Sequence, residues 1–188
     1  IDSNRLFWSD DITLSVQNVY STVDEGLYEI GADKFAFSTQ KDSIGLSGLS
    51  FVPTVPRLEY PFHKGGFQKD VFNINLKQLN IKDFDFFNFM YQGKIKGGEI
   101  AVDKPQLAVF KDKRNNVPEF QYKDIIPQMF KVAPIKISFD SVMVNQMNIR
   151  YDEFPKTGRE PGYLMLTHTD IKVLNLTNDS SELKIDST

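Results

Sequence analysis

Alternation of apolar and polar residues most constrains what this chain can fold into. The apolar members of four such stretches are Ile12, Leu14 and Val16; Phe35 and Phe37; Phe72, Ile74 and Leu76; and Ile135, Ile137 and Phe139. Because successive side chains of a strand point to opposite faces, a period of two indicates strands with one dry face and one wet face. Antiparallel sheets commonly have this arrangement. The pattern therefore predicts a mainly β fold built on a curved, bent antiparallel sheet, either an open groove or a flattened sandwich.

The composition favours strands over long helices. Aromatic residues make up 13% of the chain, and alanine, the best helix former, occurs only five times. Two short stretches, 81–91 and 122–131, place apolar residues at helical spacing. We expect these to be brief helices, with Asp83 or Asp124 available as caps.

Steps of three residues interrupt the alternation in two segments of the chain, once in 71–81 and twice in 135–151. They separate Leu76 from Leu79, Phe139 from Val142, and Val144 from Met147. One extra residue in a strand produces a β-bulge, or else a tight turn that starts a new strand. We therefore expect long bent strands, or closely linked short ones, over 71–81 and 135–151.

Turn-forming residues separate the predicted strands. Asp24-Glu25-Gly26 fits a hairpin loop between strands at 16–23 and 27–32, and residues 40–43 fit a second loop. A long polar excursion containing two prolines and two glycines, 153–162, separates two further strands. Regularly spaced turns of this kind agree with an all-β topology.

Length, charge and cysteine usage limit the class of protein. A chain of 188 residues fits a single β module over 1–188, which we expect to be a slice of a longer, membrane-tethered protein. The net charge of −3 argues against an electrostatic nucleic-acid binder. The absence of cysteine excludes disulfides and thiolate chemistry. No apolar run approaches the roughly 20 residues that a membrane helix needs.

The sequence lacks the residue patterns of common catalytic and metal sites. Its two histidines, His63 and His168, are far apart, and neither has a companion ligand at metal-site spacing. We expect His63 to be a surface loop residue and His168 to face outward from a strand. The Gly45–Gly48 stretch lacks the spacing of a nucleophile elbow. We therefore expect no catalytic residues, no metal, no cofactor and no enzyme activity.

One segment is unusually rich in aromatic side chains. Residues 84–91 read FDFFNFMY, with five aromatic residues in eight positions. One interpretation is core filler beneath a small sheet. The alternative is an apolar surface that faces lipid or a partner chain.

Three segments resemble the strand units of the AsmA-like family of bacterial envelope proteins. They are VMVNQMNIRY at 142–151, GYLMLTHTDIKVLNLTN at 162–178, and GGEIAVDKPQLAVF at 97–110. The resemblance covers most of residues 70–178. It implies a long, curved antiparallel sheet in a protein tethered to a membrane and located in the periplasm of a Gram-negative bacterium. It also implies that the hydrophobic concave face carries phospholipid.

The leading hypothesis is a non-enzymatic, AsmA-like module that accommodates or transfers lipid and supports outer-membrane homeostasis. We expect phospholipid or another apolar ligand to be its partner, and we expect no binding to nucleic acid. A segment outside this chain would attach the protein to the membrane. A sheet with one dry face must cover that face, close on itself, or offer it to a ligand. A structural or interaction β-sandwich, adhesin-like or glycan-binding, is the alternative. The candidate lining residues of the groove are Ile74, Leu76, Ile137, Phe139, Val142, Val144, Met147 and Ile149.

Overall fold

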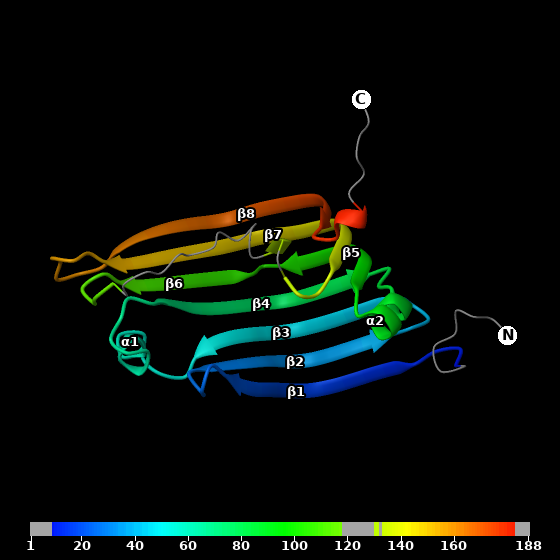
Figure 1. The fold of residues 1–188 in the computed structure, drawn as a ribbon, viewed down its shortest axis with the longest axis horizontal. Coiled ribbons are helices and arrows are strands. Elements are labelled where there is room, and N and C mark those ends of the chain that lie inside the picture. The colour runs from blue at the N-terminus through cyan, green and yellow to red at the C-terminus, as the bar shows by residue number, and fades with distance from the viewer. Residues whose placement is uncertain (1–8, 118–129, 132, 183–188) are drawn as a thin grey trace, which may run out of the picture.

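The computed structural model describes residues 9–117, 130–131 and 133–182. Eight strands form one large mixed sheet with two short helices, so the predicted mainly β class is confirmed (Figure 1). The strands are β1 (Thr13–Val23), β2 (Tyr28–Ser38), β3 (Ser43–Pro53), β4 (Asp70–Lys82), β5 (Ile95–Asp103), β6 (Gln106–Asp112), β7 (Ile137–Phe154) and β8 (Gly162–Thr177). The helical elements are α1 (Tyr60–His63), α2 (Phe86–Gln92) and the 3₁₀ turn η2 (Ser180–Glu182).

The first four strands follow one another across the sheet as antiparallel neighbours. The two halves of β4 then pair with different strands, the first half with β6 and the second half with β5. Both β5 and β6 also pair with β7, and β8 lies on the far side of β7. β5 and β6 therefore act as one long strand, interrupted only at Lys104 and Pro105 (Figure 1).

The direction of β7 departs from the expected antiparallel sheet, because β7 runs parallel to both β5 and β6. A parallel neighbour requires the chain to travel back along the sheet before the next strand starts. Residues 113–136 separate β6 from β7 in the sequence. Alternation of side chains is the same in parallel and antiparallel strands, so the sequence pattern could not reveal the direction.

The predicted turns and one predicted helix are present. Residues 24–27 form the turn between β1 and β2, where the Gly26 amide donates to the Val23 carbonyl at 3.2 Å. The helix expected over 81–91 is shorter, because residues 81–82 belong to β4 and α2 spans Phe86–Gln92. It is capped by Asp85, not Asp83, since the Asp85 carboxylate accepts from the Asn88 amide at 2.8 Å. The helix expected at 122–131, with Asp124, falls largely outside the described residues.

A line of backbone irregularities crosses the sheet near its middle. Five residues on it have positive φ angles, namely Asn18, Gly48, Lys104, Gln146 and His168. The pairing of β7 with β8 shifts register between Val144 and Met147, so the bulge predicted there is confirmed. β4 remains a single strand through Leu76 and Leu79, which fits the expected bent strand. We call this line the crease.

The step from Phe139 to Val142 coincides with a second irregularity. The pairing of β7 with β5 and with β8 has the same offset on both sides of Asp140 but leaves out Asp140 itself. Asn175, the β8 residue opposite Asp140, has a φ of 52°. Asn18 and Gly48 interrupt their strand pairs at the crease in the same way. The interruption predicted between Phe139 and Val142 therefore falls at an irregular pair, and Phe139 itself lies against Gly97, where an added Cβ would meet the ring at 2.7 Å.

Buried side chains gather at the two ends of the sheet. At the α1 end, a cluster of aromatic and aliphatic residues surrounds Tyr28, whose ring stacks on Phe51 with the centroids 4.3 Å apart. At the α2 end, Phe84 and Phe139 are buried. Between these ends, most residues of the described strands are half-buried or exposed.

Candidate functional site: an open apolar face

Two unbroken rows of apolar side chains cross the half of the sheet nearer α2. Each row contributes one residue from β1, β2, β3, β4, β5, β7 and β8, and directly paired residues share a face. The first row is Leu14, Phe37, Ile44, Ile81, Ile100, Val142 and Val173. The second row is Val16, Phe35, Leu46, Leu79, Val102, Val144 and Ile171.

A third row crosses the half nearer α1. It runs from β2 to β8 and consists of Ile30, Phe51, Ile74, Leu107, Ile149 and Leu166. Its neighbours on β3, β4 and β7 include the paired Leu49 and Leu76, and Met147. Apolar side chains thus cover both halves of the sheet.

The crease joins the rows of the two halves on one face. Val144 pairs with Ile171 and Met147 pairs with Thr169, so the three-residue step in β7 matches a two-residue step in β8. Residues two apart in a strand share a face, and the extra residue in β7 is therefore taken up by a bulge. We call the continuous surface formed by the three rows the apolar face.

No described element forms a complete second layer over this face. No member of the three rows is buried; each is half-buried or exposed. Where α2 covers the sheet, Phe86 meets Phe37 with the ring centroids 5.4 Å apart. Burial of apolar surface contributes about 25 cal/mol per Å². A ligand or protein surface that removed these side chains from water would therefore gain substantial hydrophobic stabilisation.

Six of the eight predicted lining residues lie on the apolar face. They are Ile74, Leu76, Val142, Val144, Met147 and Ile149. Ile137 and Phe139 lie beyond the irregular pair Asp140–Asn175, at the α2 end of the sheet. Phe139 belongs instead to the buried contacts at the α2 end.

The sequence prediction missed the contribution of β1, β2, β3 and β8 to the apolar face. The alternation at Leu14 and Val16, and at Phe35 and Phe37, contained the necessary signal. In β3 the apolar residues alternate with glycine and serine, as in Ile44-Gly45-Leu46-Ser47. Only the pairing register places these residues in the same rows as the predicted ones.

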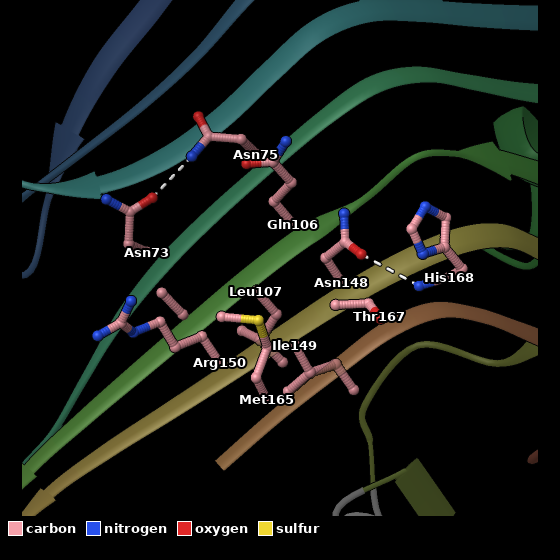
Figure 2. Close-up of a pocket in the computed structure, with 11 residues that line it drawn as sticks. Asn73, Asn75, Gln106, Leu107, Asn148, Ile149, Arg150, Met165, Thr167 and His168 are labelled. Atoms are coloured by element: carbon pink, nitrogen blue, oxygen red, sulfur yellow. Dashed lines mark hydrogen bonds between the residues drawn. The ribbon is translucent and has the colours of Figure 1, made fainter. Parts of the chain in front are cut away.

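The opposite, polar face carries a shallow hollow of about 620 Å³ across β4, β6, β7 and β8. Figure 2 shows the side chains of Asn73, Asn75, Gln106 and Asn148 around it. Asn75 donates to Asn73 at 2.7 Å, and Asn148 accepts from the backbone amide of His168 at 3.1 Å. The lining combines four neutral amides, Thr167, His168 and Arg150 with the apolar Ala108 and Met165, and with Leu107 and Ile149 of the third row. These lining residues include no carboxylate.

The buried acids of the polar face are engaged in ion pairs. Arg150 donates twice to Asp152 at 2.9 Å, and this pairing holds the pKa of the Asp152 carboxyl below its usual value. Arg114 does the same for Asp112. Asp42 is the opposite case, because burial and the nearby Asp83 and Asp85 raise its pKa. The two arginine pairs have the geometry of structural contacts.

The C-terminal turn is attached to the α2 end by charge. Lys94 contacts Asp179 at 3.0 Å, and Lys96 pairs with Glu182. Hydrogen bonds from Ser181 and from Lys94 lower the pKa of Asp179 to about 2. Asn178 binds the Ile137 amide through its side chain at 2.7 Å, so this asparagine is part of the fold.

Neither metal sites nor spanning helices are seen within the described ranges. Those residues contain no group of three His, Cys, Asp or Glu side chains placed to hold a metal ion. Among the same residues, no helix has the length and apolar character required to traverse a bilayer. Comparison with known proteins finds no family model that matches the chain, and no matching curated protein or solved structure.

Proposed function

We propose that this chain is a non-enzymatic β module whose apolar face accommodates the acyl chains of a lipid. Three rows of apolar side chains that remain accessible on one side of the sheet are the observation that carries the proposal. An acyl chain needs apolar walls and no catalytic group, and the described residues provide such walls.

A location in the cell envelope follows from the same proposal together with the sequence resemblance. A lipid carrier in the periplasm of a Gram-negative bacterium, attached to a membrane by another part of its protein, would use such a face to keep acyl chains out of water. Phospholipid is the ligand we propose first, because two acyl chains can lie along adjacent rows of the apolar face.

The alternative of a structural or interaction β-sandwich receives less support. A sandwich closes its core between two packed sheets, whereas all eight described strands belong to one sheet. The described buried residues also lie at the ends of that sheet and not across its middle.

Two substitutions at adjacent positions of β7 test the proposal. Val144 lies on the apolar face and Met143 on the polar face, and both are half-buried. We expect Val144→Glu to reduce the phospholipid that copurifies without detergent at least fivefold, because a carboxylate would have to be buried against acyl chains. Met143→Glu should leave the amount unchanged. Mass spectrometry of organic extracts measures both.

Circular dichroism of the two variants serves as the folding control. The proposal fails if purified wild-type protein contains no phospholipid and also takes up none from added phosphatidylcholine. It fails as well if Val144→Glu and Met143→Glu retain equal amounts of lipid while both remain folded.

A further inference from the structure

We propose that α2 docks this molecule on a lipid bilayer, with Phe87, Met90 and Tyr91 entering the headgroup region. This inference rests on the proposed function, because a face that carries lipid must approach a membrane to load or unload it. It adds the part of the molecule that makes the approach and the chemistry of the surface that it meets.

The residues of α2 suit a membrane interface. The helix reads FFNFMYQ and contains no charged residue. Phe87, Met90 and Tyr91 are 43%, 51% and 63% exposed, which is unusual for three such side chains on one short helix. The rings of Phe87 and Tyr91 lie 4.7 Å apart and form a single aromatic surface. Aromatic side chains with one apolar and one polar end are enriched where hydrocarbon meets water.

The exposed aromatic residues stand on a fixed base. Phe84 is buried and contacts the rings of Phe86 and Phe89. The backbone amide of Phe84 donates to the Asp42 carbonyl at 2.8 Å, and that of Asp85 donates to the Lys96 carbonyl at 2.9 Å. α2 is therefore attached to the sheet through one side and lies at one end of the sheet (Figure 1), with Phe87, Met90 and Tyr91 left exposed. Within the 84–91 segment, Phe84 is therefore a core residue, whereas Phe87, Met90 and Tyr91 form an exposed apolar surface.

The opposite end of the sheet has a different chemistry. In α1, Tyr60 and Pro61 are buried and Phe62 is exposed. The other exposed large apolar side chains of this end, Leu58, Phe67, Tyr163 and Leu164, belong to loops and to the start of β8 and not to one helix. The residues around Phe62 are charged, since Lys64 contacts Asp24 at 2.7 Å and Glu25 at 3.2 Å. A charged, ion-paired surface is costly to place among acyl chains. We therefore infer that the end of the sheet with the uncharged α2 contacts the membrane, and not the end with the ion-paired α1.

Charge and area favour a bilayer over a protein partner. The lysines next to α2 are neutralised within the molecule, since Lys94 and Lys96 pair with Asp179 and Glu182. The charge that remains beside α2 is negative, from the neighbouring Asp42, Asp83 and Asp85, and it would repel an acidic partner. The exposed parts of these aromatic and methionine side chains amount to about 400 Å², whereas a stable protein interface needs about 800 Å² from each partner. A bilayer sets no such minimum area.

Binding to vesicles of phosphatidylcholine alone tests the inference. We expect the wild-type chain to float with the vesicles, equally at low and high salt because the contact is uncharged. The triple variant Phe87→Ser, Met90→Ser, Tyr91→Ser should lose at least tenfold in vesicle affinity. The matched control is Tyr20→Ser, Phe62→Ser, Tyr163→Ser, which removes three aromatic side chains that are at least as exposed but lie elsewhere. The control variant should bind like the wild type.

The outcomes separate this inference from the proposed function. Copurified phospholipid should be the same in the α2 variant and in the wild type, because the apolar face is intact in both. Equal vesicle binding by the two triple variants would overturn the inference without touching lipid loading. Binding that disappears at high salt would overturn it in favour of an electrostatic contact. A wild-type dimer that the α2 substitutions dissociate, without any vesicle binding, would identify a second copy as the occupant and also overturn it.

Discussion

At the scale of single residues, the Tyr28 side chain provides a hydrogen-bond acceptor for β4 where β4 no longer pairs with β3. The pairing between these strands ends at Phe51 and Ile74, whereas β4 begins four residues before Ile74. The Phe72 amide donates instead to the Tyr28 hydroxyl at 3.0 Å. The Tyr28 ring is buried against Phe51 and Tyr60, so one side chain both fills the core and replaces a strand partner.

Removal of this hydroxyl should be costly even though the ring remains. We expect Tyr28→Phe to lower the free energy of unfolding by about 1–2 kcal/mol, because the Phe72 amide is left without its acceptor. Urea denaturation measures the loss. Tyr20→Phe is the control, since Tyr20 is exposed. Equal stability of Tyr28→Phe and the wild type would show that water replaces the hydroxyl.

Residue identity alone was a poor guide to burial. Phe139 and Val142 are both apolar and close in sequence, yet Phe139 is buried next to Gly97 and Val142 is half-buried on the apolar face. Val144 and Met147 show the same three-residue step, and there the pairing of β7 with β8 shifts register. At Phe139 and Val142 the offset is unchanged, and the irregular residue is Asn175 on β8. The backbone conformations of Gln146 and Asn175 are not dictated by their side chains.

At the scale of elements, the crease depends on residues that tolerate a left-handed backbone. Gly48 in β3 has a φ of +60°, and a Cβ there would lie 2.0 Å from Oδ2 of Asp33. Glycine adopts this conformation without the steric cost that other residues incur. The Asp33 carboxylate therefore occupies space that only a glycine leaves free.

We expect Gly48→Ala to lower the free energy of unfolding by about 1–2 kcal/mol, from the left-handed backbone alone. Gly45→Ala is the matched control in the same strand. Gly45 has no positive φ, and its added Cβ would meet nothing closer than Asn80 at 3.6 Å. Thermal or urea denaturation compares the two. Equal losses would mean that the crease does not require glycine.

The elements themselves were largely predictable, and their pairing was not. Alternation and turn residues located β1, β2 and the hairpin at Gly26, because these signals are local. The partners of β7 depend on contacts between residues distant in sequence, which no local pattern encodes. The same holds for the candidate site. The sequence predicts lining residues on β4 and β7, but it does not predict those on the other strands.

At the scale of the whole molecule, stability should be unevenly distributed. Every residue of β1 is exposed, and this strand has a single neighbour, whereas β3 and β4 are paired on both sides. Regions with little buried apolar contact open locally at a low free energy. β1 also contains no charged residue and no proline, the features that commonly protect a sheet edge.

Hydrogen exchange measures this gradient directly. We expect the β1 amides that bond to β2 to exchange at least tenfold faster than the amides of β4 that bond to β3. Mass spectrometry on peptides from the two strands makes the comparison. Uniform protection of β1 and β4 would indicate that the sheet opens only as a unit.

The parallel course of β7 also has a kinetic consequence. The hairpin of β1 and β2 joins residues that are close along the chain, whereas Ile137 lies 42 residues after its partner Ile95. Distant pairings form slowly because the intervening chain must lose entropy before they are made. During refolding, the strands from β1 to β4 would assemble early, and the arrival of β7 would set the time at which both halves of the molecule are complete.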